Sequence, residues 1–359
     1  METNHETILE VNLNTLEDNF RYLKSKLNAK TKIIAVVKAY AYGHGDIEIS
    51  KKLEKLGVHA LWVADFEEGC NLRDNGVNVP IIIANPGTKS SEQITNNNLD
   101  IVIYNFNLLD IYGSLNKEIN IHIKFNTGMN RYGFDPIDIK EINNKLQKYP
   151  KLKVQSVCSH LAASDNTAKD ELSKKQFEIF ESTCEKLFAE IGYKLDRHIL
   201  NTNGVLRFIE KEYEMVRLGI GLYGSTTNKE LKQISSLQSV ITQTRIIQKG
   251  ESIGYDASFT ADRKMKIGII PFGYADGLNR KLSTSKGVIS VNNVLCPIIG
   301  KISMDSCMVD LSNTNATAGN KVIIFGNENS ILSIAKKLGT IPYEIYATLN
   351  RRIKRTYST

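Results

Sequence analysis

The sequence predicts an α/β fold followed by a β-rich part, namely an N-terminal (β/α)8 TIM-like barrel and a mostly β C-terminal domain. Apolar runs alternate with helical stretches from residue 33 to about residue 220, and eight such runs can be counted. Repeated strand and helix units form parallel sheets, and eight of them favour a closed barrel. A doubly wound open sheet is the alternative, although no Gly-rich dinucleotide fingerprint follows any of the strands. The alternation stops near Ser235, where short strands separated by turn signals begin.

The first elements show the two periodicities clearly. A strand is expected at residues 7–11 (TILEV), and Asn14 with Glu17 then gives a capping-box-like start to a helix. The apolar stripe of this helix consists of Leu16, Phe20, Leu23 and Leu27. The run at 33–37 (IIAVV) does not alternate, which is typical of a strand buried on both faces of a parallel sheet. Asp46 is placed to begin the next helix.

Seven further strands complete the predicted barrel. They are expected at residues 60–65, 80–85, 99–104, 120–125, 153–160, 197–201 and 214–220. The clearest intervening helix covers 177–191, where apolar residues recur at helical spacing. We therefore expect a barrel over residues 8–234 and a β-rich domain over residues 235–359, which residues 1–7 can join.

Composition places the chain among ordinary globular proteins, since 42% of the residues are hydrophobic and 24% are charged. The net charge of +7 is scattered, which favours anionic small molecules over nucleic acid. No leader-like start and no apolar run of membrane-spanning length occurs, so we expect a cytoplasmic protein that binds no membrane. The five cysteines form no CxxC pair, and we expect neither a metal site nor a disulfide framework.

Chemically capable side chains recur where the predicted strands end. They are Lys38, Arg131, His160, Asn201, Thr202 and Arg217. Active sites of such barrels lie at the carboxyl ends of the strands, so these residues are expected to converge. Each has an ordinary structural alternative, such as a lysine that extends to water or an arginine in a rim ion pair. Convergence of the whole set favours a site instead.

A strand-end lysine beside an anion-binding site made of uncharged donors points to one cofactor. Burial lowers the pKa of a lysine and makes it a base or an imine-forming nucleophile. After Arg217, the stretch LGIGLYGS can turn the N–H groups of Gly219 and Ile220 outward, and with the Thr202 hydroxyl they form a phosphate cradle. A lysine nucleophile beside a phosphate cradle suggests pyridoxal 5'-phosphate, bound as a Schiff base.

The segment AVVKAYAYGHG at residues 35–45 resembles the cofactor-lysine motif of the alanine racemases, the fold type III pyridoxal-phosphate enzymes. The similarity continues in order through KFNTGMNRYGF, SHLAASD, HILNTNG, EMVRLGIGLYG, ESIGYDASFTA, PFGYADG and GKISMDSCMVDL. It implies an isomerase that interconverts L- and D-alanine by a two-base mechanism and supplies D-alanine for peptidoglycan. A broader small amino-acid racemase, for example of serine, a decarboxylase relative and a non-catalytic cofactor carrier are the alternatives.

The resemblance also implies roles for the catalytic and substrate-binding residues. Lys38 would bind the cofactor and act as one base, and Tyr255 would be the base on the opposite face. Arg217 would face the pyridine nitrogen and, with His160, tune Tyr255. Arg131 and the backbone of Met304 would hold the substrate carboxylate.

Further implied residues concern the phosphate and the assembly. The expected phosphate ligands are Tyr42, Thr202, Gly219, Ile220 and Tyr343. In the family, Tyr255 and Met304 reach the lysine of the other subunit, so the resemblance implies a homodimer with shared active sites.

Four positions bear on substrate breadth and on how the site is tuned. Lys124 aligns with a lysine that is carbamylated in several members of the family, which would turn a cation beside Arg131 into an anion. Tyr40 stands where many members have Asn, Asn126 replaces a frequent Asp, and Arg351 occupies the place of a phosphate-side tyrosine.

Overall fold

A computed structural model describes residues 5–359 and divides them into two compact units. One unit contains Glu17–Ala41 and Asp46–Leu222, and the other contains the described residues up to Leu16 together with Tyr42–Gly45 and Tyr223–Thr359. The units depart from the expected ranges mainly because β1 (Ile8–Asn12) pairs with strands of the second unit. Of the segment 1–7, residues 1–4 lie outside the described part.

The first unit, which we call the barrel unit, is the predicted parallel barrel, and it confirms the fold class. Its strands are β2 (Lys32–Val36), β3 (Ala60–Val63), β4 (Ile81–Ile83), β5 (Asp100–Ile103), β6 (Ile119–Lys124), β7 (Leu152–Cys158), β8 (Asp196–His198) and β9 (Met215–Leu218). All their ladders are parallel, in the order β8-β7-β6-β5-β4-β3-β2-β9. The N–H of Arg217 donates to the carbonyl of Leu200 at 2.9 Å, which joins the chain beyond β8 to β9.

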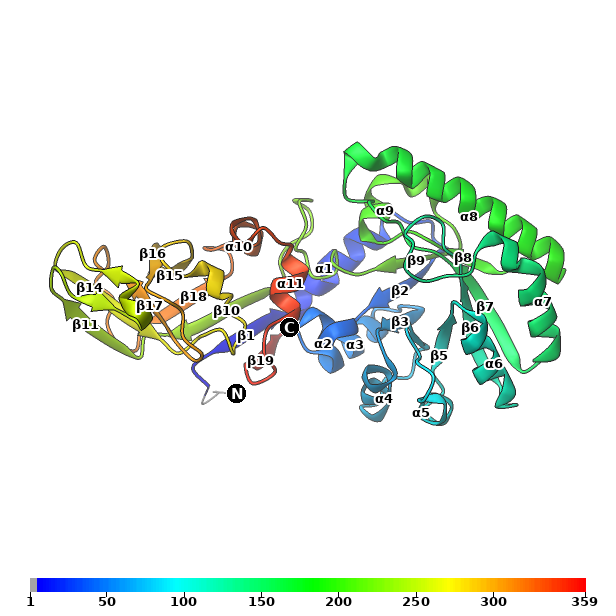
Figure 1. Cartoon of the computed structure of the whole chain (residues 1–359), viewed down its shortest axis with the longest axis horizontal. Coiled ribbons are helices and arrows are strands. Elements are labelled where there is room, and N and C mark those ends of the chain that lie inside the picture. The colour runs from blue at the N-terminus through cyan, green and yellow to red at the C-terminus, as the bar shows by residue number, and fades with distance from the viewer. Residues whose placement is uncertain (1–4) are drawn as a thin grey trace. The chain divides into compact units, whose positions relative to one another are not determined.

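Helices surround these strands, as Figure 1 shows in blue, cyan and green. They are α1 (Leu13–Lys24), which begins in the second unit, α2 (Lys38–Tyr42), which ends there, α3 (Asp46–Lys55), α4 (Phe66–Asp74), α5 (Ser91–Asn96), α6 (Phe106–Ser114), α7 (Ile139–Lys148), α8 (Asp170–Ile191) and α9 (Thr202–Arg207). Short 3-10 turns occur at η1 (Pro136–Asp138), η2 (Thr167–Lys169) and η3 (Ile209–Lys211). Within residues 5–359, no helix has both the length and the apolar character needed to cross a membrane.

The helix expected over 177–191 is the longest of the barrel unit. Phe177, Phe180, Cys184 and Leu187 are buried along one face of α8, as the spacing predicts. The helix ends at Gly192, whose φ of 84° is the left-handed conformation common at helix C-termini.

The second unit is built on a nine-stranded sheet in the order β11-β14-β17-β16-β15-β18-β10-β1-β19. Its later strands are β10 (Ser235–Val240), β11 (Gln243–Ile247), β14 (Met265–Ile270), β15 (Val288–Val291), β16 (Val294–Ile299), β17 (Cys307–Asp310), β18 (Lys321–Phe325) and β19 (Lys354–Ser358). The remaining elements are β12 (Ser252–Ile253), η4 (Tyr255–Ala257), β13 (Phe259–Thr260), η5 (Arg280–Leu282), α10 (Ile331–Leu338) and α11 (Pro342–Ala347). Every ladder is antiparallel except that of β1 with β19.

Two local features place short segments within the second unit, which we call the β unit. Asn292 and Asn293 both have positive φ, 50° and 64°, which is the geometry of the tight turn that joins β15 to β16. The short segment Tyr42–Gly45 belongs to the β unit because His44 is fully buried there and its Nε2 lies 2.9 Å from Oγ of Ser235.

Candidate active site

Lys38 stands at the rim of the barrel on an unusual turn. β2 ends at Val36, and the backbone then becomes left-handed, with φ of 54° at Ala39, 57° at Tyr40 and 49° at Ala41. This conformation costs an L-residue roughly 1–2 kcal/mol relative to its right-handed counterpart. The strand is therefore ended abruptly just where the lysine occurs, and the lysine is placed at the carboxyl end of β2.

The surroundings of Lys38 lower the pKa of its amine. Loss of surrounding water at the barrel rim lowers the pKa of the amine, and the positive charges of Arg131 and Arg217 lower it further. Glu68 opposes the shift. A neutral amine is the nucleophilic form of lysine, so the charges here support covalent chemistry at Nζ.

Arg217 lies in β9, and only 4% of it is exposed. Its guanidinium donates to the carbonyls of Ser159 and Ile199 at 2.5 and 3.2 Å, and to Nδ1 of both His198 and His160. Burial and the Arg217 charge hold the pKa of both histidines well below the usual value of 6.5, so both are neutral. Because a guanidinium only donates, each Nδ1 accepts and each Nε2 carries the hydrogen.

A polar chain continues from Arg217 into the barrel, and sequence reasoning missed it. Nε2 of His198 lies 2.9 Å from Oγ of Ser156, which lies 2.6 Å from Nδ1 of His122. His198 must donate to Ser156, which leaves the Ser156 hydroxyl hydrogen available to donate to His122. Nε2 of His122 then lies 3.6 Å from the Asp100 carboxylate. The signal available was a histidine or serine within each of three neighbouring predicted strands.

Lys124 and Arg131 lie beside His160 and line one small pocket with it. Burial, with the nearby charges of Arg217 and Arg131, lowers the pKa of Lys124 to about 8. Its Nζ lies 5.8 Å from the centre of the Tyr132 ring. The Lys124 amine thus becomes neutral within the physiological range of pH.

Asn126 organises the loop that contains Arg131. Its Oδ1 accepts the N–H groups of Gly128 and Asn130 at 3.2 and 3.0 Å, and its Nδ2 donates to Oδ1 of Asn130 at 3.0 Å. An aspartate could accept the same two N–H groups, but it has no hydrogen for the Asn130 oxygen. Asn130 therefore supplies an acceptor that suits an asparagine, and not an aspartate, at position 126.

The phosphate cradle differs from expectation in one respect. The prediction that the Gly219 N–H faces outward is wrong, because it donates to Oγ1 of Thr202 at 3.0 Å, and Gly221 N–H does so at 3.3 Å. Thr202 fixes the loop with both acceptor sites, which leaves its own hydrogen to donate. The Ile220 N–H has no acceptor among residues 5–359. Two donors thus remain for an anion.

The other expected residues belong to the β unit. The Tyr42 ring lies 4.7 Å from that of Tyr223 and 5.7 Å from that of Tyr343, centre to centre, and burial raises the pKa of Tyr42. Tyr255 is 68% exposed and Met304 54% exposed, both large fractions for such residues. The Met304 carbonyl accepts the N–H of Ala275 at 3.0 Å. Met304 therefore has its N–H, not its carbonyl, to offer a substrate carboxylate.

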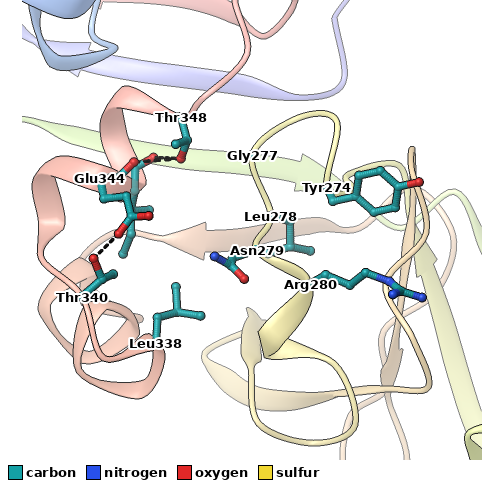
Figure 2. Close-up of a pocket in the computed structure, with 10 residues that line it drawn as sticks. Tyr274, Gly277, Leu278, Asn279, Arg280, Leu338, Thr340, Glu344 and Thr348 are labelled. Atoms are coloured by element: carbon teal, nitrogen blue, oxygen red, sulfur yellow. Dashed lines mark hydrogen bonds between the residues drawn. The ribbon is translucent and has the colours of Figure 1, made fainter.

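The β unit also contains a cavity of about 300 Å³, shown in Figure 2. It is lined by Tyr274, Gly277, Leu278, Asn279, Arg280, Leu338, Thr340, Glu344, Ile345 and Thr348. Glu344 accepts a hydrogen bond from the Thr340 hydroxyl on one side of it. None of the predicted site residues lines this cavity.

Two curated relatives match the chain over nearly its whole length. Alanine racemase 2 of Caldanaerobacter subterraneus subsp. tengcongensis is 34% identical over 98% of this chain and 94% of its own. The alanine racemase of Helicobacter pylori (strain Shi470) is 34% identical over 98% of each chain.

Solved structures agree with these relatives. The alanine racemase of Clostridium difficile 630 matches 99% of this chain and 97% of its own, with a TM-score of 0.94 and 30% identity. That of Bartonella henselae, with covalently bound pyridoxal phosphate, matches 99% of this chain and 100% of its own, with a TM-score of 0.88 and 27% identity. Residues 11–227 and 234–357 match the models of the alanine racemase N-terminal and C-terminal domains. The chain therefore belongs to the alanine racemase family.

Proposed function

We propose that this protein is a pyridoxal-phosphate-dependent alanine racemase, an isomerase that interconverts L- and D-alanine and supplies D-alanine for peptidoglycan. Family membership supports the activity, as does one observation: a lysine at the barrel rim whose pKa is lowered by loss of surrounding water and by the charges of Arg131 and Arg217. The related Bacillus anthracis enzyme, 26% identical with a TM-score of 0.94 over 100% of this chain and 96% of its own, was solved with bound L-Ala-P. An alanine-like ligand therefore suits the same site here.

The residues present fit the cofactor. Lys38 supplies the amine for covalent attachment, and the Ile220 N–H and the Thr202 hydroxyl supply neutral donors for a phosphate. We infer that Tyr42 and Tyr343 also bind the phosphate, and that Gly219 contributes by holding the Thr202 hydroxyl through its N–H. When bound, the cofactor supplies an electron-withdrawing ring that acidifies the Cα proton of an attached amino acid.

Inversion requires a proton donor and a proton acceptor on opposite faces of Cα. A single base with one proton returns it to the side from which it came. We assign Lys38 to one face and Tyr255 to the other, with Arg217 and His160 acting on the cofactor nitrogen and on Tyr255. Arg217 can only donate a hydrogen bond, so it would leave a pyridine nitrogen held opposite it unprotonated, which would favour racemisation over transamination. Arg131 and the Met304 N–H hold the substrate carboxylate.

The exposure of Tyr255 and Met304 supports a homodimer with shared active sites. Two large side chains that the monomer leaves in solvent would be covered by a second copy, and the second base would then reach the partner's Lys38. We also infer a cytoplasmic location from membership of the family. No nucleic-acid partner is expected, since the positive charge is scattered along the chain. Sedimentation at assay concentration tests the assembly, because a fully active monomer would contradict it.

The decisive experiment is direct. The purified protein is scanned for the absorbance band of the bound cofactor, and D-alanine formation from L-alanine is followed. A cofactor band with alanine racemisation supports the proposal. Racemisation of serine but not of alanine would replace the substrate assignment, decarboxylation would replace the reaction, and a band without turnover would indicate a cofactor carrier.

A further inference from the structure

One partly buried carboxylate of the barrel unit has no role in the proposed racemase chemistry. Glu68, on α4, directs its two oxygens to two separate segments. Oε2 accepts the N–H of Ala64 at 2.7 Å, and Oε1 accepts the N–H of Ala39 at 2.6 Å. The first contact is local and satisfies a donor at the start of α4. The second joins α4 to the residue that directly follows Lys38.

Helix capping alone does not explain this arrangement. Asp65 already caps α4 by accepting the N–H of Glu68 at 3.1 Å. Ala39 lies 29 residues earlier and begins the left-handed run, whose other backbone support includes the Ala41 N–H bond to the Val37 carbonyl at 2.8 Å. Strained backbone of this kind persists only when its surroundings hold it, and clusters at functional sites. Glu68 supplies such a hold at the first strained residue.

The charge of Glu68 is also well placed. Arg131 and Arg217 act on Lys38 with positive charge, and Glu68 acts on it with negative charge. An ionised carboxylate accepts the two N–H groups more strongly than a neutral carboxyl group does, because hydrogen bonds to a charged acceptor are charge-assisted. Burial raises the pKa of Glu68, and the N–H groups of Ala64 and Ala39 oppose that rise. In its ionised form this one carboxylate serves the turn and the lysine together.

We propose that Glu68 is a positioning residue for the racemase reaction: its carboxylate fixes the left-handed turn after Lys38 and thereby sets the direction and basicity of the Lys38 amine. The inference rests on the proposed role of Lys38 as the cofactor lysine. It assigns Glu68 no contact with substrate or cofactor.

The first test measures the turn itself in protein freed of cofactor. Hydrogen exchange of the Ala39 amide is compared in wild type, Glu68→Gln and Glu68→Ala, with Glu67→Gln as the control. Glu67 is an exposed carboxylate on the same turn of α4. Loss of a charge-assisted hydrogen bond should speed exchange about tenfold in Glu68→Ala. Glu68→Gln keeps the shape of the side chain but only one of its two acceptor oxygens. It replaces Glu68→Ala in this measurement if the alanine variant folds poorly.

The second test measures the amine. The pH dependence with which acetic anhydride modifies Lys38 is followed by peptide mass in the same cofactor-free proteins. The midpoint should move to lower pH in Glu68→Gln, because the lysine loses the negative charge that favours its protonated form. Glu67→Gln should match wild type.

Both measurements are independent of turnover, so they separate this inference from the proposed activity. Faster exchange at Ala39 with a lowered labelling midpoint supports it even if the protein racemises another amino acid. Wild-type exchange at Ala39 with faster exchange at Ala64 would show that Glu68 only caps α4, and the inference would then be wrong. An unchanged labelling midpoint would overturn the electrostatic part.

Discussion

Nη2 of Arg217 lies 3.2 Å from Nδ1 of His160, and this contact requires an imidazole without a hydrogen at that atom. The same guanidinium donates to Nδ1 of His198. Protonation of either histidine would set an N–H against an N–H inside the barrel. Arg217 therefore keeps two histidines neutral and directs the Nε2–H of each away from itself.

The first prediction concerns stability against pH. Since the pKa of His160 and of His198 is well below 6.5 in the folded protein, the unfolded chain takes up protons first as the pH falls. The stability that the two neutral histidines contribute is then fully present above pH 6.5. It is lost as the pH falls below that value, by at most about 1.4 kcal/mol per pH unit for each histidine. Urea unfolding of cofactor-free protein between pH 7.5 and 5.5 measures the slope.

His198→Gln provides the check on this cause. The variant should be less stable at pH 7.5 and should show a shallower slope toward pH 5.5, whereas His5→Gln, at an exposed position, should retain the wild-type slope. A slope unchanged by His198→Gln would assign the acid sensitivity to other groups.

Lys124 is the subject of the second prediction. With its pKa lowered to about 8, its amine is substantially neutral in weakly alkaline solution, and a neutral amine adds carbon dioxide. We expect one carbamate signal by carbon-13 NMR with labelled bicarbonate, stronger at pH 8.5 than at pH 7. It should be absent from Lys124→Gln and present in Lys151→Gln, an exposed lysine of the same unit. A bare ammonium in a high-resolution density map would contradict the prediction.

The third prediction tests whether active sites are shared between subunits. Lys38→Ala should abolish activity in both directions, and Tyr255→Phe should abolish proton abstraction from the L-enantiomer. If Tyr255 serves the partner's Lys38, an equal mixture of the two variants should regain up to about a quarter of wild-type activity. Half of the dimers formed by random exchange are mixed, and each has one complete site of two. No recovery after subunit exchange would place both bases on one chain.

The barrel was predictable because its signal is local. Each strand is a short apolar run, and Lys38 falls directly after one of them, so the position of the lysine at the rim follows from chain order alone. β1 was misassigned because its partners, β10 and β19, lie more than two hundred residues away in sequence. The Thr202 contact with Gly219 was missed for a related reason, since a hydroxyl that accepts cannot be distinguished by sequence from one that donates.

The left-handed turn after Lys38 was also beyond sequence reasoning. Glycine and asparagine normally mark positive φ, yet Ala39, Tyr40 and Ala41 adopt it here. Tertiary contacts override local preference at this point, as is expected of a functional segment. The structure thereby accounts for the asparagine that many alanine racemases have at position 40, because asparagine adopts this conformation more easily than tyrosine.

The fourth prediction follows from that turn. Replacing Tyr40 by Asn should relieve strain at φ 57° and raise the stability of cofactor-free protein by about 0.5–1 kcal/mol. Tyr193→Asn is the matched control, since Tyr193 is 51% exposed and has no positive φ. Denaturant midpoints of wild type and both variants measure the effect. A Tyr40→Asn variant no more stable than Tyr193→Asn would mean that contacts of the tyrosine ring outweigh the backbone strain, and that the departure at position 40 is maintained by packing.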